Sequence, residues 1–187
     1  MQSTASGSYS TAIGQGTTAS SYSIAMGQGT TASGSRSTAT GYSTTASGYA
    51  STAMGQETTA SATYSTATGY STEANGIASF SMGKETEASD FGSLVIGTYN
   101  SVGNAVTTNG SASAFDVDNS AFVIGNGASG ALSDALVVYS NGNATLGGAL
   151  TVATTIGHTA DADLMTLANG SVTFTGSTVI ATADVNG

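Results

Sequence analysis

The sequence contains no cysteine, no proline and no tryptophan, and only two of its 187 residues are lysine or arginine. Without cysteine, the chain has no disulfide framework and no thiol-based metal or redox site. Eleven acidic residues give a net charge of −9. Such a chain cannot neutralise phosphates, so nucleic acid and anionic membrane surfaces are excluded as partners. No cofactor is expected.

Long apolar segments are also missing. No run approaches the roughly 18 residues that cross a membrane, and the N-terminus lacks the basic and apolar stretches of a signal peptide. We therefore expect any export signal or anchor to lie outside this sequence. Leu and Val are absent before Leu94 and frequent after it. This change predicts a boundary near residue 90, between a first domain (residues 1–99) and a second domain (residues 100–187).

A glycine recurs with a constant period through the first domain, except for one shorter interval that lacks a single residue near Ser20–Ser21. The glycines are Gly14, Gly27, Gly41, Gly55, Gly69, Gly83 and Gly97. The unit reads T-A-S-G-x-x-S-x-A-x-G-x-x-T, as in Thr4–Gly14 and Thr45–Gly55. A flexible linker would not keep this register over seven copies, so the pattern predicts a repeat fold.

The stretch S-x-A-x-G alternates, which is typical of a strand. Ser10 and Ala12 are expected to face one side, and Thr11 and Ile13 the other. One unit fits two short strands and two turns, and we place the seven glycines at turns. Coils stacked about 4.8 Å apart would have a thin core, mainly of Ala with one larger residue such as Ile13 or Met54. We therefore expect several identical chains to associate around one axis.

The unit resembles the head repeat of trimeric autotransporter adhesins, the YadA-like heads, whose signature is similar to N-S-x-A-I-G. Ser93–Gly97 (S-L-V-I-G) and Ser10–Gly14 (S-T-A-I-G) match it best, and the resemblance covers residues 3–99. It implies an all-β fold: a left-handed parallel β-roll, or solenoid, of about seven coils that assembles as a homotrimer. It also implies an extracellular fibre whose partners are a cell-surface glycan or protein receptor and neighbouring fibre or anchor domains.

The second domain carries a different repeat, in which Ala135–Val152 aligns with Asp163–Ile180. Each copy is an alternating run, an Asn-Gly pair and a second alternating run. This pattern predicts hairpins that turn at Asn141–Gly142 and at Asn169–Gly170, in a β-prism-like stalk. The stretch Ser120–Gly148 resembles segments of bacteriophage tail fibres, which implies a virion fibre.

Few side chains suggest a chemical site. Asp116 and Asp118 could supply oxygen ligands to calcium, and His158 could bind metal where three chains converge, but a polar turn and a solvated loop also explain them. The serines lack a His partner for a hydrolase triad, so we expect no enzyme. Tyrosines near the coil turns could stack on sugar rings or cover the flank of the roll: Tyr9, Tyr22, Tyr42, Tyr49, Tyr64 and Tyr70.

Three functions fit these observations. The first is a segment of an attachment fibre, where the tail-fibre-like stretch and the missing export signal favour a phage-type tail fibre over a bacterial surface adhesin. The second is an ice-binding β-solenoid, using threonine pairs that recur once per coil, such as Thr17–Thr18 and Thr30–Thr31. The third is a polysaccharide-degrading spike with an active site across a trimer interface, although no pair of carboxylates stands out.

Overall fold

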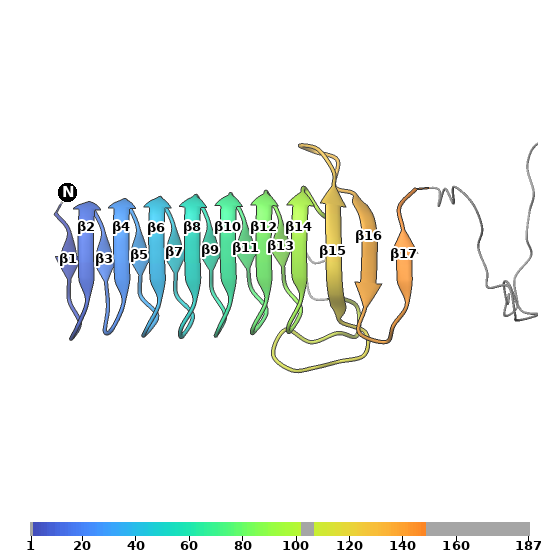
Figure 1. Cartoon of the computed structure of the whole chain (residues 1–187), viewed down its shortest axis with the longest axis horizontal. Coiled ribbons are helices and arrows are strands. Elements are labelled where there is room, and N and C mark those ends of the chain that lie inside the picture. Colours follow the sequence, from blue (N-terminus) through green and yellow to red (C-terminus); the bar gives the residue numbers. More distant parts are fainter. Residues whose placement is uncertain (1, 102–106, 149–187) are drawn as a thin grey trace, which may run out of the picture. The chain divides into compact units, whose positions relative to one another are not determined.

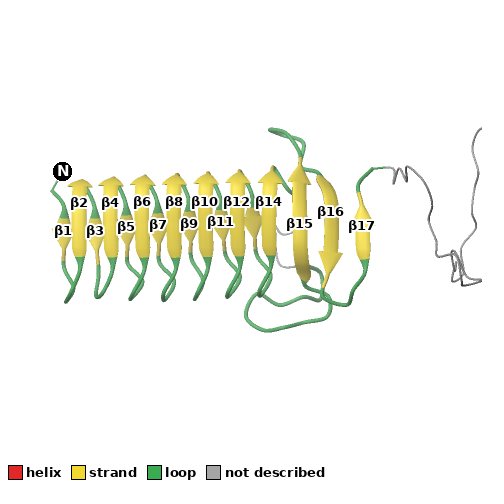
Figure 2. Ribbon diagram, viewed as in Figure 1, coloured by secondary structure: helices red, strands yellow, loops and turns green. Residues whose placement is uncertain are grey.

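The polypeptide runs as a series of coils, each made of one short strand, one long strand and two turns (Figure 1). The computed structural model describes residues 2–101 and 107–148, and every regular element in them is a β-strand (Figure 2). Short strands of two residues alternate with long strands of five residues through β14. The sequence period thus produces the predicted parallel β-solenoid of about seven coils, which is confirmed.

Each type of strand forms its own parallel sheet. The short sheet contains β1 (Thr4–Ala5), β3 (Thr18–Ala19), β5 (Thr31–Ala32), β7 (Thr45–Ala46), β9 (Thr59–Ala60), β11 (Glu73–Ala74) and β13 (Glu87–Ala88). The long sheet begins with β2 (Thr11–Gln15), β4 (Ile24–Gln28), β6 (Thr38–Tyr42), β8 (Thr52–Gln56), β10 (Thr66–Tyr70), β12 (Phe80–Lys84) and β14 (Leu94–Thr98). The shortened interval falls in the turn between β3 and β4, so every repeat position stays aligned with its neighbours.

The core between the two sheets consists of alanine. Nine alanines have no exposed surface and form one cluster: Ala19, Ala25, Ala32, Ala39, Ala46, Ala53, Ala60, Ala67 and Ala74. The larger residues expected in this core lie outside it, because neighbouring positions of a strand point to opposite faces. Ile13 is 58% exposed, Met54 44% and Met82 45%, and Met26 shares their row. Each coil therefore buries even less apolar surface than the sequence suggested.

The seven repeat glycines were predicted at turns, but the structure places them inside the long strands, as the fourth residue of each. Their φ angles lie between 107° and 132°. The reason is close approach between coils: a Cβ on Gly55 would lie 2.0 Å from the carbonyl oxygen of Gly69. The turns use other residues in the left-handed region, including Tyr64 and Glu57.

Two polar columns run through the interior. Ser51 ends the turn before β8, and its hydroxyl donates to the carbonyl oxygen of Gly48 at 2.8 Å. Ser23, Ser37, Ser65 and Ser93 close their turns in the same way. The second column is buried threonine, in which five hydroxyls have no hydrogen-bond partner among the described residues: Thr17, Thr30, Thr44, Thr58 and Thr72. The first residue of each threonine pair is thus inside the solenoid and unavailable to ice.

The long sheet continues past residue 99. After a loop, β15 (Ser120–Asn126) pairs in parallel with β14, and Gly97 aligns with Gly125. Next come β16 (Asp134–Tyr139) and β17 (Ala144–Leu146), which pair antiparallel (Figure 1). A second buried cluster forms here from Ala88, Val95, Val123 and Val137. Three of its four members are valine, so the core becomes bulkier at the end of the solenoid.

Candidate functional site

The outer face of the long sheet carries a row of apolar side chains that is interrupted by threonine, and β6 and β10 contribute threonine alone. It consists of the outward-pointing first and third residues of the long strands, and we call it the outer row. Its largest exposed members are Ile13, Ile24, Met26, Met54, Met82 and Leu94, each at least 39% exposed. Phe122 and Ile124 of β15 extend it, because they align with Leu94 and Ile96. Exposed isoleucine, methionine and leucine side chains that recur along one face favour association through that face.

The tyrosines named from the sequence are divided between two places. Tyr9, Tyr22 and Tyr64 occupy left-handed turn positions, with φ angles of 56°, 58° and 60°, and Tyr49 precedes one such position. They contact one another across coils: the rings of Tyr9 and Tyr22 stack with centroids 5.2 Å apart, and those of Tyr49 and Tyr64 meet edge to face at 5.8 Å. Tyr42 and Tyr70 instead end the long strands β6 and β10.

The outer side of the short sheet becomes acidic at its end. Glu73 and Glu87 stand on adjacent strands in the place of threonine. The Oε1 atom of Glu87 accepts hydrogen bonds from Ser89 Oγ at 2.7 Å and from Asn75 Nδ2 at 3.0 Å. Burial raises the pKa of the Glu87 carboxyl, these two hydrogen bonds oppose the rise, and the charge of Glu73 adds to it.

Asp90 joins the last coil to the loop that follows it. Its carboxylate is fully buried, and it accepts from the backbone N–H groups of Thr107 at 2.8 Å and Ser120 at 2.7 Å. The hydroxyls of the same two residues also donate to it. Four donors compensate for the desolvation of this charge. Asp90 thus fixes the start of β15 and the start of the described loop to the solenoid.

Two asparagines complete this end of the solenoid. Asn100 stands where earlier coils have the buried threonine; its Oδ1 accepts from Glu87 N at 2.9 Å and its Nδ2 donates to Glu87 O at 3.0 Å. The side-chain amide therefore takes the place of a further short strand. Asn119 is also fully buried, and its Oδ1 accepts from Ser111 N at 2.6 Å. These contacts end the short sheet and hold the loop across it.

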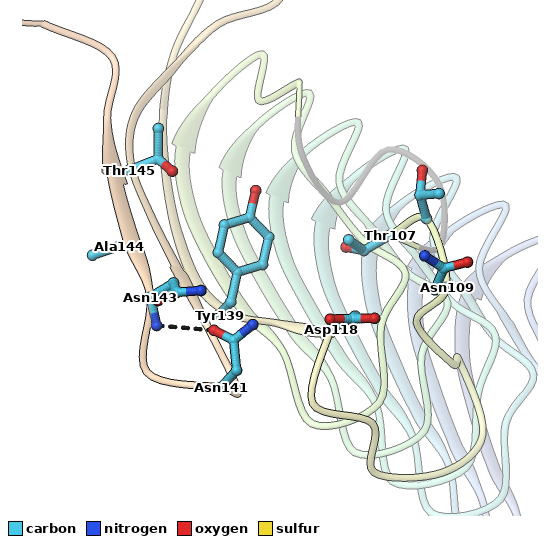
Figure 3. A pocket seen from close by; sticks show the side chains of 9 residues that line it. Thr107, Asn109, Asp118, Tyr139, Asn141, Asn143, Ala144 and Thr145 are labelled. Atoms are coloured by element: carbon cyan, nitrogen blue, oxygen red, sulfur yellow. Dashed lines mark hydrogen bonds between the residues drawn. The ribbon is translucent and has the colours of Figure 1, made fainter. Parts of the chain in front are cut away.

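A polar groove lies between this loop and the final hairpin (Figure 3). Thr107, Thr108, Asn109 and Asp118 line one side, and Tyr139, Asn141, Asn143, Ala144 and Thr145 line the other. Its volume is about 540 Å³, within the range of roughly 300–1,000 Å³ that is usual for small-molecule sites. Figure 3 shows the Tyr139 ring between the two walls. We call this feature the terminal groove.

The predicted calcium ligands do not converge. Asp116 Oδ1 accepts from the backbone N–H of Asp118 at 3.0 Å, which closes a turn, and Asn119 points into the protein. Within residues 2–101 and 107–148, no group of three or more His, Asp or Glu side chains could hold a metal ion. His158 and the Asn169–Gly170 pair lie outside the described residues. Asn141 and Gly142 lie between β16 and β17, and Gly142 has a φ of 86°.

The residues that form the C-terminal end of the solenoid were not predicted from the sequence. Asp90 replaces the glycine of T-A-S-G, and Asn100 replaces the buried threonine, so each is a departure from the repeat consensus. The strand β15 was also missed, although Asn119–Gly125 reads N-S-A-F-V-I-G and lies two repeat lengths after the last copy. The terminal groove had no such signal, because its two walls come from separate segments of the chain that share no pattern.

Comparison with known proteins finds a family match within the solenoid. The family model of the YadA head domain repeat matches in two copies, over residues 2–17, 19–44 and 46–72. No curated protein matches the chain. In the described part of the chain, no helix has the length and hydropathy needed to span a membrane. The match and the parallel solenoid point to a structural, adhesin-like protein rather than an enzyme. The coils within residues 2–72 are thus similar to YadA head domain repeats, and the match covers less than half of the chain.

Proposed function

We propose that the chain is a segment of a homotrimeric surface fibre that attaches to a cell. The observation that carries this proposal is the outer row. A single chain leaves Met54, Met82 and Ile13 between 44% and 58% exposed along one sheet, above a core whose apolar residues are alanine. Burying such a strip between copies would supply the apolar contacts that the coil lacks.

Residues 100–187 would then serve as connector and stalk, and the fibre would stand outside the cell. Two types of fibre are compatible with this architecture. The family match lies in the adhesin head repeats and favours a trimeric autotransporter adhesin. The tail-fibre-like stretch Ser120–Gly148, which lies outside that match, favours a phage-type fibre. The adhesin is the better supported of the two, and a surface-exposed bacterial protein is our preferred assignment.

The mass of the protein in solution tests the proposal. Light scattering coupled to size exclusion should give a mass three times that of the 18.1 kDa chain. Met54→Glu should convert the trimer to monomer, because it would bury unpaired carboxylates between chains while remaining in water on a single chain. Thr59→Glu is the matched control on the short sheet, where Glu73 and Glu87 stand naturally, and it should stay trimeric.

Two results would contradict the proposal. One is a wild-type protein that is monomeric while its circular dichroism shows ordered β-structure. The other is a Met54→Glu variant that keeps the trimeric mass. The first would indicate a self-sufficient single-chain solenoid, and the second would place the association surface elsewhere.

A further inference from the structure

The terminal groove presents polar groups that the protein itself does not use. Among the described residues, the Asp118 carboxylate, the Tyr139 phenol and the Asn143 side-chain amide have no hydrogen-bond partner. All three line the groove. Figure 3 shows Asp118 on the loop side, and Tyr139 and Asn143 on the hairpin side. The site thus offers one charged acceptor, one hydroxyl and one amide to a ligand.

The backbone that carries these side chains is held in place by hydrogen bonds. The N–H of Asp118 donates to Asp116 Oδ1 at 3.0 Å, and the N–H of Asn143 donates to Asn141 Oδ1 at 2.9 Å. The N–H of Tyr139 donates to the carbonyl oxygen of Asn143 at 2.8 Å. The Tyr139 ring packs against the buried valine cluster. Binding would therefore order side-chain rotamers without ordering the backbone, which limits the entropy lost.

The chemistry of the lining restricts the ligand. Among the described residues that line the groove, Asp118 is the only charged one and none is lysine, arginine or histidine, so an anionic ligand would meet repulsion without compensation. A metal ion would find a single carboxylate, too few for the usual oxygen cage. A sugar ring fits the remaining groups: its hydroxyls donate to carboxylate and amide oxygens, and its C–H face stacks on an aromatic ring. We propose that the terminal groove binds a neutral oligosaccharide.

The groove would stay accessible in the assembled fibre. Tyr139 is two residues after the buried Val137 on β16, so both lie on the inner side of the sheet. The outer row, which includes Phe122 and Ile124, projects from the opposite side of the same sheet. Association of chains through the outer row would therefore leave the groove open. The inference deepens the adhesive function proposed above and rests on it for its biological meaning, but the site itself needs only one chain.

The full-length chain would be applied to an array of neutral and sialylated oligosaccharides, and each hit measured by saturation-transfer NMR and titration. We expect binding to neutral oligosaccharides and not to sialylated ones. Asp118→Ala should weaken the affinity at least about tenfold, the loss expected for hydrogen bonds to a charged acceptor. This variant should keep its melting temperature, because the Asp118 side chain makes no hydrogen bond to the described protein.

Tyr64→Ala is the matched control, since Tyr64 is 58% exposed on a solenoid turn far along the chain from the groove. It should bind like the wild type. The inference would be overturned by binding of no array member, by binding of sialylated members alone, or by unchanged affinity in Asp118→Ala. Loss of binding in Tyr64→Ala would move the site to the turn tyrosines. A trimeric mass in any of these cases would keep the fibre proposal and reject only the groove.

Discussion

Replacement of Thr58 by valine should stabilise the protein, although threonine recurs at this position in every coil from Thr17 to Thr86. The Thr58 side chain is fully buried, and its hydroxyl has no hydrogen-bond partner in the described part of the chain. An unsatisfied buried hydroxyl costs about 1–3 kcal/mol. Valine has nearly the same shape and carries no such group, so Thr58→Val should raise the free energy of unfolding by about that amount.

The same substitution two coils later should have the opposite sign. The Thr86 hydroxyl lies 2.8 Å from Ser81 Oγ, and both are buried. Ser81 stands where Ala53 stands in the coil of Thr58, so only the later coil contains this hydroxyl pair. Thr86→Val would leave Ser81 unpaired and should destabilise by about 1–3 kcal/mol. Ala53→Ser supplies the missing partner and should stabilise the Thr58 coil.

Thermal unfolding followed by circular dichroism, at one protein concentration for all variants, measures these effects. For a chain of this size, a change of about 1 kcal/mol moves the midpoint by roughly 2–4 °C. We expect Thr58→Val to melt above the wild type and Thr86→Val below it. Equal losses at both positions would refute the reasoning. They would mean that the Thr58 hydroxyl is satisfied in solution, for example by an internal water.

Two further substitutions test the charge and backbone arguments. The raised pKa of Glu87 means that its ionisation opposes folding, so Glu87→Gln should melt above the wild type at neutral pH. The difference in melting temperature between variant and wild type should vanish below about pH 4, where the carboxyl is protonated in both folded and unfolded chains. A difference that stays constant between neutral and acidic pH would contradict the raised pKa of Glu87. Gly55→Ala should lower the free energy of unfolding by about 2–5 kcal/mol, through backbone strain and overlap with the next coil. Gly92→Ala is the control, because nothing lies within 4 Å of its Cβ position, and it should lower the free energy of unfolding by about 1 kcal/mol. Equal melting temperatures for the two variants would be inconsistent with the close approach of Gly55 to Gly69.

The repeat was predictable because one physical requirement recurs in every coil. Alternation around Ala12 and Ala53 fixes which side faces inward, and the constant period fixes how coils align. The positions of the glycines were not predictable from the pattern alone. Gly55 makes room for a carbonyl oxygen of the next coil, one full repeat further along the chain, while the turns tolerate Tyr64 at positive φ. A recurring glycine therefore indicated crowding between coils rather than a change of direction.

The end of the solenoid lay beyond prediction for a different reason. Asp90, Asn100 and Asn119 act through contacts that occur once, so no periodicity reveals them. The carboxylate of Asp90 reaches Thr107 and Ser120, which lie much later in the chain. Only a charged residue at a repeat position that otherwise holds glycine, alanine or serine signals such a role. The terminal groove was even harder to predict, because it forms only when these contacts have placed the loop beside the hairpin.

Side chains on the two sides of the long sheet serve the two proposed functions, assembly and ligand binding. On the long sheet, one side of the strands faces the interior, which is alanine along the coils and valine at their end, and the other side carries the outer row. At β16 the core side is no longer covered by a further coil, and Tyr139 lines a groove there instead. The surface proposed for assembly and the surface proposed for ligand binding thus lie on opposite sides of one sheet. A substitution in the groove can then change the ligand without weakening the trimer, which allows receptor preference to vary while the repeat is retained.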